Sequence, residues 1–455
     1  MRKIIQYMMM ALIAVVLASC ANDISEESTP TVKSNIRFVV DDFPMFEKPS
    51  TRTIGEEDKG KTAWAVGDEI CVKLESKELG IQTATLKYNG VKFEIQDGNS
   101  LCYLDGEPVT AYAYYAPNRK WRNGSLDFKD IYGNPNGTAE FLEATCTVHY
   151  GDNNYVDISF ANATRNYSRL RIATIPKTEI KVDADNFAPT DNPNRLYMTY
   201  TLTSDEKGNA YLYGTFYNNS IVTVKYRGAT LKTYKFSKET ENAKSYVLDA
   251  TVISANSAEE IYSAIKQEVA NSKTAIRLNL ASDAGDNEFN AIREAFENVR
   301  GYGTIDLTLI GCKEIPVNGL YRIMALKSIT LPDVTKIRMD ALSSCLYLQE
   351  ICAPNVSAID EYAFGKCRYL RKVTLGKLTD VRGEANSRSG IFDDINDLYP
   401  DIDLYLPKNQ EVMEFDENSK QYIWKPTGES YFASPDYYDN GIFLGYQFHS
   451  VKSWE

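Results

Sequence analysis

The chain has 455 residues, of which 43% are hydrophobic and 25% are charged, a balance typical of globular proteins. It excludes a wholly disordered or collagen-like chain. Lys and Arg number 50 against 62 Asp and Glu, a net charge of −12 with no strongly basic segment, so we expect no nucleic-acid partner. Only two histidines are present, His149 and His449. We therefore predict no catalytic residues, no metal site, no cofactor and no enzymatic activity.

Residues 1–19 have the pattern of a secretion signal. Two basic residues precede an apolar run that ends at Ala18 and is shorter than the about 20 residues of a membrane-spanning helix. The tetrapeptide Leu-Ala-Ser-Cys that ends at Cys20 resembles the lipobox of bacterial lipoproteins, which implies lipidation of Cys20. The alternative is an ordinary signal peptide in which Cys20 is incidental. Both interpretations predict that the chain leaves the cytoplasm.

Residues 20–34 are polar and acidic, and too poor in apolar side chains to fold, so we predict a flexible tether after the lipidated cysteine. Asp23, Glu26 and Glu27 resemble the acidic signal that accompanies export to the outer face in Gram-negative lipoproteins. A plain linker fits the same composition. The resemblance implies a lipid-anchored protein at the cell outer membrane, exposed on the surface.

Residues 35–254 read as strands. Short runs with alternating apolar residues, such as 36–40 and 69–74, are separated by clusters of Gly, Asn and Asp about every ten residues. This spacing predicts antiparallel sheets, and the length exceeds one small sandwich. We expect two β-sandwiches, at residues 35–152 and 153–254.

This half resembles the fimbrillin family of Gram-negative surface lipoproteins and pilins. The resemblance rests on Thr51-Arg52, on Trp64 to Ile70, and on the aromatic strand from Ala111 to Pro117. In that family two stacked sandwiches form a subunit, and pilins polymerise by strand donation after a protease cuts at an arginine. Arg52 is therefore a candidate cleavage site. The chain departs from the family because its long C-terminal half leaves no obvious donor strand.

Residues 255–410 change character. Helical spacing is present at 257–269 and 286–299, and a 22-residue self-similarity follows. The aligned apolar columns are Leu326, Leu348 and Leu370; Ile329, Ile351 and Val373; Leu331, Ala353 and Leu375; Val334, Val356 and Leu378; Ile337, Ile359 and Val381. A single coil cannot bury its apolar face alone, so stacked coils must form the core, with the two helices as an N-terminal cap.

The repeating unit resembles the BspA-like class of leucine-rich repeat, whose exported members are often adhesins or binding proteins. Cys345 and Cys367 occupy its inward column of small residues, where core packing explains them better than a metal or a disulfide. Seven cysteines follow Cys20, an odd number without a CxxC spacing, so we expect mostly buried free thiols. The fold class predicted for the chain is mainly β with some α: two antiparallel β-sandwiches followed by a leucine-rich repeat solenoid.

Side chains that flank the inward positions of each repeat strand must point the other way. They predict a polar ladder on the concave face, where solenoids commonly hold a partner. A simply solvated face is the alternative. The ladder consists of Asp306, Thr308, Ser328, Thr330, Glu350, Cys352, Lys372 and Thr374.

Residues 411–455 are rich in aromatic side chains and are expected to cap the open end of the repeat, although an exposed subset could stack on sugars or proteins. The favoured function is a surface adhesin or binding protein, with the repeat as recognition head on a fimbrillin-like stalk. Its partners would be the membrane, through the lipid anchor, and a protein or glycan of a host or neighbouring cell. The alternatives are a fimbrial accessory or tip subunit that contacts fimbrial subunits, and a glycan-binding lipoprotein for nutrient capture.

Overall fold

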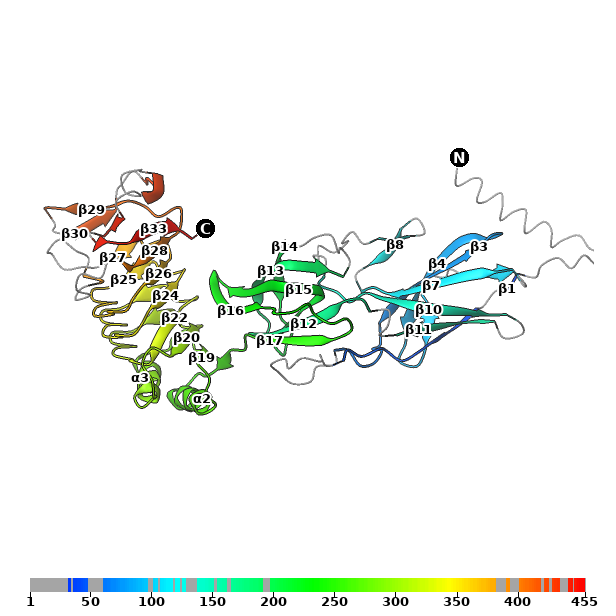
Figure 1. Cartoon of the computed structure of the whole chain (residues 1–455), viewed down its shortest axis with the longest axis horizontal. Helices are drawn as coiled ribbons and strands as arrows, with labels where there is room; N and C mark the ends of the chain where they lie inside the picture. The colour runs from blue at the N-terminus through cyan, green and yellow to red at the C-terminus, as the bar shows by residue number, and fades with distance from the viewer. Residues whose placement is uncertain are drawn as a thin grey trace, which may run out of the picture. The chain divides into compact units, whose positions relative to one another are not determined.

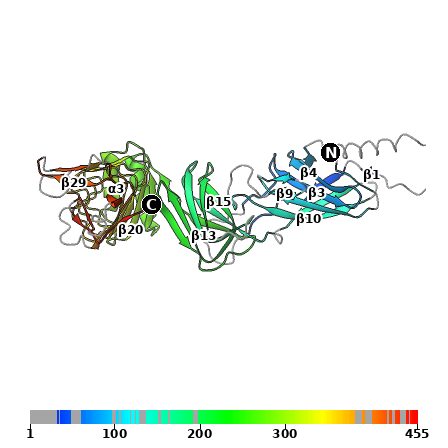
Figure 2. The same cartoon turned by 90° about the horizontal axis from the view of Figure 1, so that it is seen from above.

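The computed structural model shows a mainly β chain that divides into two compact units (Figures 1 and 2). The first unit is drawn from Met1–Pro44, Ala63–Lys129 and Leu142–Thr164; the second takes Met45–Thr62, Asp130–Phe141 and Arg165–Glu455. The described residues are 32–33, 36–47, 60–96, 101–104, 107–117, 119–122, 125–127, 137–150, 154–161, 165–190, 197–381, 390–392, 401–418, 421–424, 428–433, 441–444 and 446–454.

The first unit is built on a seven-stranded sheet of order β2-β11-β10-β7-β3-β4-β5. Its neighbours are antiparallel except β2 and β11, which run parallel. Two short pairs, β1–β6 and β8–β9, accompany it. The strands are β1 (Val32–Lys33), β2 (Arg37–Val40), β3 (Glu69–Ser76), β4 (Gly80–Tyr88), β5 (Phe93–Ile95), β6 (Tyr103–Leu104), β7 (Val109–Tyr115), β8 (Lys120–Arg122), β9 (Ser125–Asp127), β10 (Leu142–His149) and β11 (Tyr155–Phe160).

The core of this unit follows from alternation along the strands. In β3, Ile70, Val72 and Leu74 are fully buried because every second side chain faces the same side of the sheet. The ring of Trp64 packs edge-on against those of Phe43 and Phe93, with centroids 4.9 Å apart in both pairs. The edge strands β2 and β5 contact one another, so the sheet curves around this core.

The second unit begins with a six-stranded sheet of order β14-β13-β15-β12-β17, in which β16 also pairs with β15. All pairs are antiparallel except β12 and β17. The long strand β15 therefore pairs with three strands: β13 along much of its length, β12 with its first half and β16 with its second half. The strands are β12 (Ser168–Ala173), β13 (Glu179–Pro189), β14 (Tyr197–Thr203), β15 (Asn209–Tyr226), β16 (Ala229–Lys235) and β17 (Ser245–Asp249).

The rest of the second unit contains two parallel sheets that share one core. The larger has eight strands in the order β18-β19-β20-β22-β24-β26-β28-β33, and the smaller has the order β21-β23-β25-β27. The strands are β18 (Ile253–Ser254), β19 (Ala275–Asn279), β20 (Ile305–Ile310), β21 (Glu314–Ile315), β22 (Leu326–Thr330), β23 (Lys336–Ile337), β24 (Glu350–Ala353), β25 (Ala358–Ile359), β26 (Lys372–Leu375), β27 (Asp380–Val381), β28 (Asp403–Leu406) and β33 (Ser450–Ser453).

The strand register repeats the 22-residue period of the sequence. Ile329 pairs with Ile351 and Ile351 with Val373, and all three are fully buried. In the smaller sheet Ile337 pairs with Ile359. The aligned apolar positions of successive strands therefore lie next to one another in one core. A single strand cannot bury its apolar side chains alone, so each depends on its neighbours.

Helices α2 (Ala258–Ala270) and α3 (Asp286–Phe296) flank β19 in the chain. Ser257 caps α2 by accepting a hydrogen bond from the backbone N–H of Glu260, as expected for a serine before an acidic first turn. The helices bury Ile261, Ile265 and Phe289 in the core of the parallel sheets.

The C-terminal segment adds a hairpin and a turn before it returns to the large sheet as β33. Tyr431, Phe443, Tyr446 and Phe448 are buried in the same core as the repeat columns, so these aromatics close it. The elements are β29 (Met413–Asp416), β30 (Gln421–Trp424), η3 (Tyr431–Ala433), β31 (Ile442–Phe443) and β32 (Tyr446–Gln447). In the described part of the chain, no helix combines the length and apolar character needed to span a membrane.

Candidate functional site

The strand register brings all eight residues of the predicted polar ladder onto the outward face of the large parallel sheet, opposite the core. They form two rows that run across the strands. We call these the charged row and the threonine row. The charged row is Asp306, Ser328, Glu350 and Lys372, and the threonine row is Thr308, Thr330, Cys352 and Thr374.

The charged row is internally paired. Ser328 Oγ donates to Asp306 Oδ1 at 2.6 Å, and Lys372 Nζ donates to Glu350 Oε1 at the same distance. Burial disfavours the charged form of Lys372, but the hydrogen bond and negative charge of Glu350, together with smaller contributions from Cys352 and Tyr405, outweigh burial and raise the pKa of Lys372. The ion pair offsets the charges of Glu350 and Lys372, so the charged row presents one net negative charge, that of Asp306.

The threonine row makes fewer hydrogen bonds than the charged row. Thr308 is 7% exposed, whereas Thr330 and Thr374 are half-buried. Among the described residues, the hydroxyls of Thr330 and Thr374 have no hydrogen-bond partner. Burial and the charge of Glu350 raise the pKa of Cys352 to about 11, so this thiol stays protonated and is a poor nucleophile near neutral pH.

Both rows extend further toward the C-terminus than the sequence suggests. Strand β28 adds Asp403 and Tyr405, and β33 adds Ser450 and Lys452. The ring of Tyr405 lies between two ammonium groups, 5.7 Å from Lys372 Nζ and 5.9 Å from Lys452 Nζ. The extension therefore adds an aromatic side chain flanked by cations, a group suited to recognition.

Asp403 is the acidic centre of this extension. It accepts hydrogen bonds from Ser450 Oγ and from His449 Nδ1, the latter at 2.8 Å. These two bonds, with Lys452 Nζ at 3.9 Å, lower the pKa of Asp403. The carboxylate is thereby held ionised at the C-terminal end of the charged row.

At the opposite end, the threonine row continues into β19 through Arg277, which pairs with Thr308. Arg277 Nε donates to the backbone carbonyl of Leu231 in β16 at 3.0 Å. The six-stranded sheet thus approaches the start of the ladder. Burial lowers the pKa of Arg277, and the charges of Asp249, Asp306 and Glu268 oppose that effect.

A column of stacked tyrosines lies where the strands of the large sheet begin. The rings of Tyr302 and Tyr347 are stacked with centroids 4.9 Å apart, and those of Tyr347 and Tyr369 with centroids 5.3 Å apart. Tyr302 and Tyr369 are 67% and 51% exposed. Tyr347 and Tyr369 are 22 residues apart, so the repeat alignment could have revealed this pair, although our sequence interpretation missed it.

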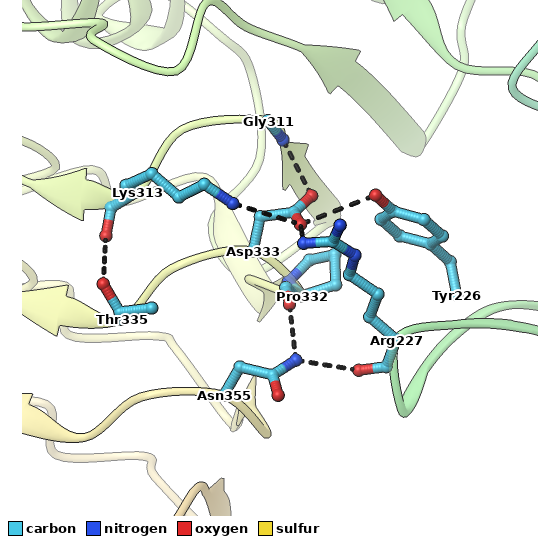
Figure 3. A network of polar contacts seen from close by, with 8 residues as sticks. All are labelled: Tyr226, Arg227, Gly311, Lys313, Pro332, Asp333, Thr335 and Asn355. Atoms are coloured by element: carbon cyan, nitrogen blue, oxygen red, sulfur yellow. Dashed lines mark hydrogen bonds and ion pairs between the residues drawn. The ribbon is translucent and has the colours of Figure 1, made fainter. Parts of the chain in front are cut away.

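A polar network fixes the six-stranded sheet to the loops of the repeat (Figure 3). It centres on the carboxylate of Asp333, which is only 2% exposed. Arg227 Nη1, at the tip of the β15–β16 hairpin, donates to Asp333 Oδ1 at 2.5 Å, and the backbone N–H of Gly311 donates to Oδ2 at 2.9 Å (Figure 3). Asn355 Nδ2 donates to the carbonyls of both Arg227 and Pro332.

The cysteines of the described chain are free thiols. Cys345 Sγ and Cys367 Sγ donate to the carbonyls of Leu320 and Leu342 at 3.1 and 3.2 Å, one repeat apart. Burial raises the pKa of Cys345 to about 12. Over the described residues, no group of His, Cys, Asp and Glu is arranged to hold a metal ion. The predicted lipidation site Cys20 and the predicted cleavage site Arg52 lie outside the described residues.

The comparisons with known proteins bear on the repeat. A family model described as the BspA type leucine-rich repeat region matches residues 290–391 in six copies. This range contains β20, β22, β24 and β26, the strands that carry the predicted ladder. No curated protein matches the chain.

Solved structures give a weaker likeness. Two crystal structures of variants of the shaft pilin SpaA from Lactobacillus rhamnosus GG are 11% and 14% identical to this chain. Each comparison covers 48% of this chain and 94% and 97% of the pilin, with a TM-score of 0.16. A TM-score this low carries no conclusion about the fold or the function.

Proposed function

We propose that this protein is a surface lipoprotein, anchored through Cys20, that acts as an adhesin or binding protein. Its recognition head is a BspA-like leucine-rich repeat solenoid formed by the two parallel sheets, and its stalk consists of two fimbrillin-like β-sandwiches. The outward face of the large sheet holds a protein or glycan of a host or neighbouring cell. The family match at residues 290–391 supports a surface binding role for this region.

The threonine row carries the proposal. Thr330 and Thr374 are half-buried, and within the described structure their hydroxyls are unpaired. Neighbouring strands of a sheet lie about 4.8 Å apart, so the row offers polar groups at a regular interval. An extended peptide or glycan that lies across the strands could form hydrogen bonds to successive side chains of the threonine row. Tyr405, which extends the threonine row, and the exposed rings of Tyr302 and Tyr369 add aromatic surface that supports a binding role.

The test is binding of the chain from residue 21 onward to matrix proteins, mucins and polysaccharides, measured by surface plasmon resonance. Thr330→Arg and Thr374→Arg place bulk and charge in the threonine row. Thr379→Arg is the matched control, since Thr379 is exposed next to the smaller sheet. We expect saturable binding that both row variants weaken at least tenfold, about 1.4 kcal/mol, while the control binds like the wild type.

Equal binding by the row variants and the wild type would move recognition away from this face. Anchoring is tested separately by labelled palmitate. We expect incorporation in the full-length wild type and none in Cys20→Ala, because the thiol is the acceptor of the lipid. Incorporation in that variant would refute the proposed anchor.

A fimbrial accessory or tip subunit is the second candidate function, and the place of β2 favours it. This strand is an edge strand, paired in parallel with β11, and it precedes Arg52 in the chain. Cleavage after Arg52 would sever β2 from β3 and allow β11 to accept a strand from another subunit. Copurification with pili and a cut at Arg52 would support this role, above all if no ligand binds the repeat.

A further inference from the structure

A cleft of about 580 Å³ lies beside the N-terminal end of the ladder, within the second unit. Its walls come from β16 and β17 of the six-stranded sheet and from α2 and β19 of the repeat. Sites for small ligands favour such junctions between packed elements, where few polar groups are held among apolar ones.

Of the three basic residues that line the cleft, Arg277 has only part of its hydrogen-bonding capacity in use. Arg277 lines it, half-buried, and donates through Nε to the carbonyl of Leu231. Over the described residues, its Nη atoms have no hydrogen bond and no ion pair. Because Arg277 alternates with the fully buried Ile276 and Leu278 along β19, its side chain is held on the cleft side of the strand. Two hydrogen-bonding nitrogens are thus available to a ligand.

Two carboxylates line the same cleft without closing onto that cation. Asp249 accepts a hydrogen bond from the backbone N–H of Thr251 at 3.0 Å, and the described structure gives the Glu268 side chain no hydrogen bond. The negative charges of Asp249 and Glu268 act to raise the pKa of Arg277. In the described chain, however, neither carboxylate forms an ion pair with Arg277. The guanidinium of Arg277 and the carboxylates of Asp249 and Glu268 therefore line one cleft and leave hydrogen-bonding groups available to a ligand.

An aromatic side chain completes the wall. Lys232, Tyr234 and Phe236 alternate along and just beyond β16 and line the cleft together. Tyr234 is 39% exposed, whereas Phe236 is 5% exposed and meets the Tyr234 ring edge-on, with centroids 4.9 Å apart. The ring of Tyr234 is held by the Phe236 ring and remains partly open to a ligand.

The balance of charge selects the ligand. Asp249 and Glu268 would repel an anion, and Arg277, with Lys232 and Lys273 on the lining, would repel a cation. A neutral sugar has hydroxyls that both donate and accept, and a C–H face that packs on an aromatic ring. We propose that this cleft is a binding site for a neutral pyranose sugar, with its ring on Tyr234 and its hydroxyls bonded to Arg277, Asp249 and Glu268.

The proposed sugar site includes none of the eight ladder residues, and its test uses the chain from residue 21 onward. The probes are the methyl glycosides of glucose, galactose, mannose and N-acetylglucosamine, titrated by saturation-transfer and chemical-shift NMR. Ligands of this size bind with a Kd of about 1 mM when their hydroxyls and one face are used. We expect at least one glycoside to bind saturably in that range.

Variants identify the cleft as the site. Tyr234→Ala and Glu268→Gln each weaken binding at least tenfold, because the first removes the aromatic wall and the second replaces one charged acceptor oxygen of Glu268 by a neutral amide NH2. Tyr262→Ala and Glu259→Gln are matched controls on exposed positions of α2 that do not line the cleft, and they bind like the wild type. A thermal melt checks that all four variants fold.

Two outcomes overturn the proposal. One is the absence of saturable binding by all four glycosides up to about 50 mM, well above the expected Kd. The other is binding that Tyr234→Ala and Glu268→Gln leave unchanged. Thr330→Arg should leave sugar binding intact whether or not it abolishes binding of a macromolecule, so the failure of either proposal can be told from that of the other.

Discussion

Arg227 and Asp333 are 106 residues apart in the chain, and their side chains meet at 2.5 Å. Arg227 lies in a tight hairpin turn in which it and Gly228 both have positive φ, +46° and +85°. Such turns match the twist of the two strands they join, so the guanidinium is presented at a fixed hairpin tip. The contact joins the six-stranded sheet to the loops of the repeat, and it makes the second unit depend on a buried charge.

Asp333→Asn is expected to destabilise the second unit by about 3 kcal/mol. The amide cannot neutralise Arg227, and its NH2 group would face Arg227 Nη1 or the Gly311 N–H, which are themselves donors. Arg227→Ala should cost less, about 1 kcal/mol, since Lys313 Nζ at 3.7 Å and the backbone N–H of Gly311 still offset the charge of Asp333. The measurement is urea unfolding of the full chain from residue 21, with Asp283→Asn as control, since Asp283 is an exposed carboxylate without a partner among the described residues. A loss for Asp333→Asn equal to that of the control would show that the contact is not structural.

The strands of the repeat were largely predictable from sequence because their apolar residues recur at a fixed interval of 22 residues. A column such as Leu326, Leu348 and Leu370 can be buried only if the strands align at the period of the repeat, and alternation then fixes which side chains face outward. The strand register aligns the eight ladder residues in two rows across the strands. The role of the ladder in binding remains a prediction.

Contacts between segments that do not follow the 22-residue period could not be predicted, because no sequence column aligns them. Asp403 and Ser450 are partners although 47 residues separate them, so no column aligns β28 with β33. Arg277 lies before the periodic stretch, and its environment depends on Leu231 of another sheet. The contact of Arg227 with Asp333 likewise depends on how two folded regions meet, which no local pattern contains.

The thiols of Cys345 and Cys367 are expected to resist alkylation in the folded chain. Burial raises the pKa of Cys345 to about 12 and that of Cys367 well above its usual value, so at pH 8 only about one thiol in ten thousand is ionised at Cys345. Mass spectrometry after iodoacetamide treatment should find both unmodified until urea unfolds the protein. Cys102, which is less buried, is the internal control and should react first. Rapid native modification of Cys345 would contradict its place in the core.

Tyr347→Ala should lower the free energy of unfolding by about 2 kcal/mol, because it removes two stacked ring pairs at once. Tyr347→Phe keeps both rings in place and should stay within about 0.5 kcal/mol of the wild type. Tyr321→Ala is the control for truncation of an exposed tyrosine outside the column. Chemical unfolding followed by circular dichroism measures all three. If Tyr347→Ala and Tyr321→Ala prove equally mild, the stacking is incidental to stability.

Asp403 should make the protein sensitive to acid. Its pKa is lowered in the folded state by the hydrogen bonds from His449 and Ser450, so proton binding favours the unfolded chain. The stability it contributes is complete above the unfolded pKa of about 3.9 and is lost as pH falls through the lower folded value. Asp403→Asn should therefore cost about 0.5–1 kcal/mol at pH 7, a modest figure because the side chain is 32% exposed.

That difference should shrink as the pH falls below about 4, since the wild-type carboxyl then becomes neutral like the amide. Urea unfolding of both proteins at pH 7, 4 and 3 provides the comparison, with Asp283→Asn showing what an exposed carboxylate contributes. A difference that stays constant down to pH 3 would mean that shape, rather than charge, distinguishes Asp403 from Asn. A difference that disappears would place an ionised acceptor at the C-terminal end of the charged row, where it holds His449, Ser450 and Lys452 together.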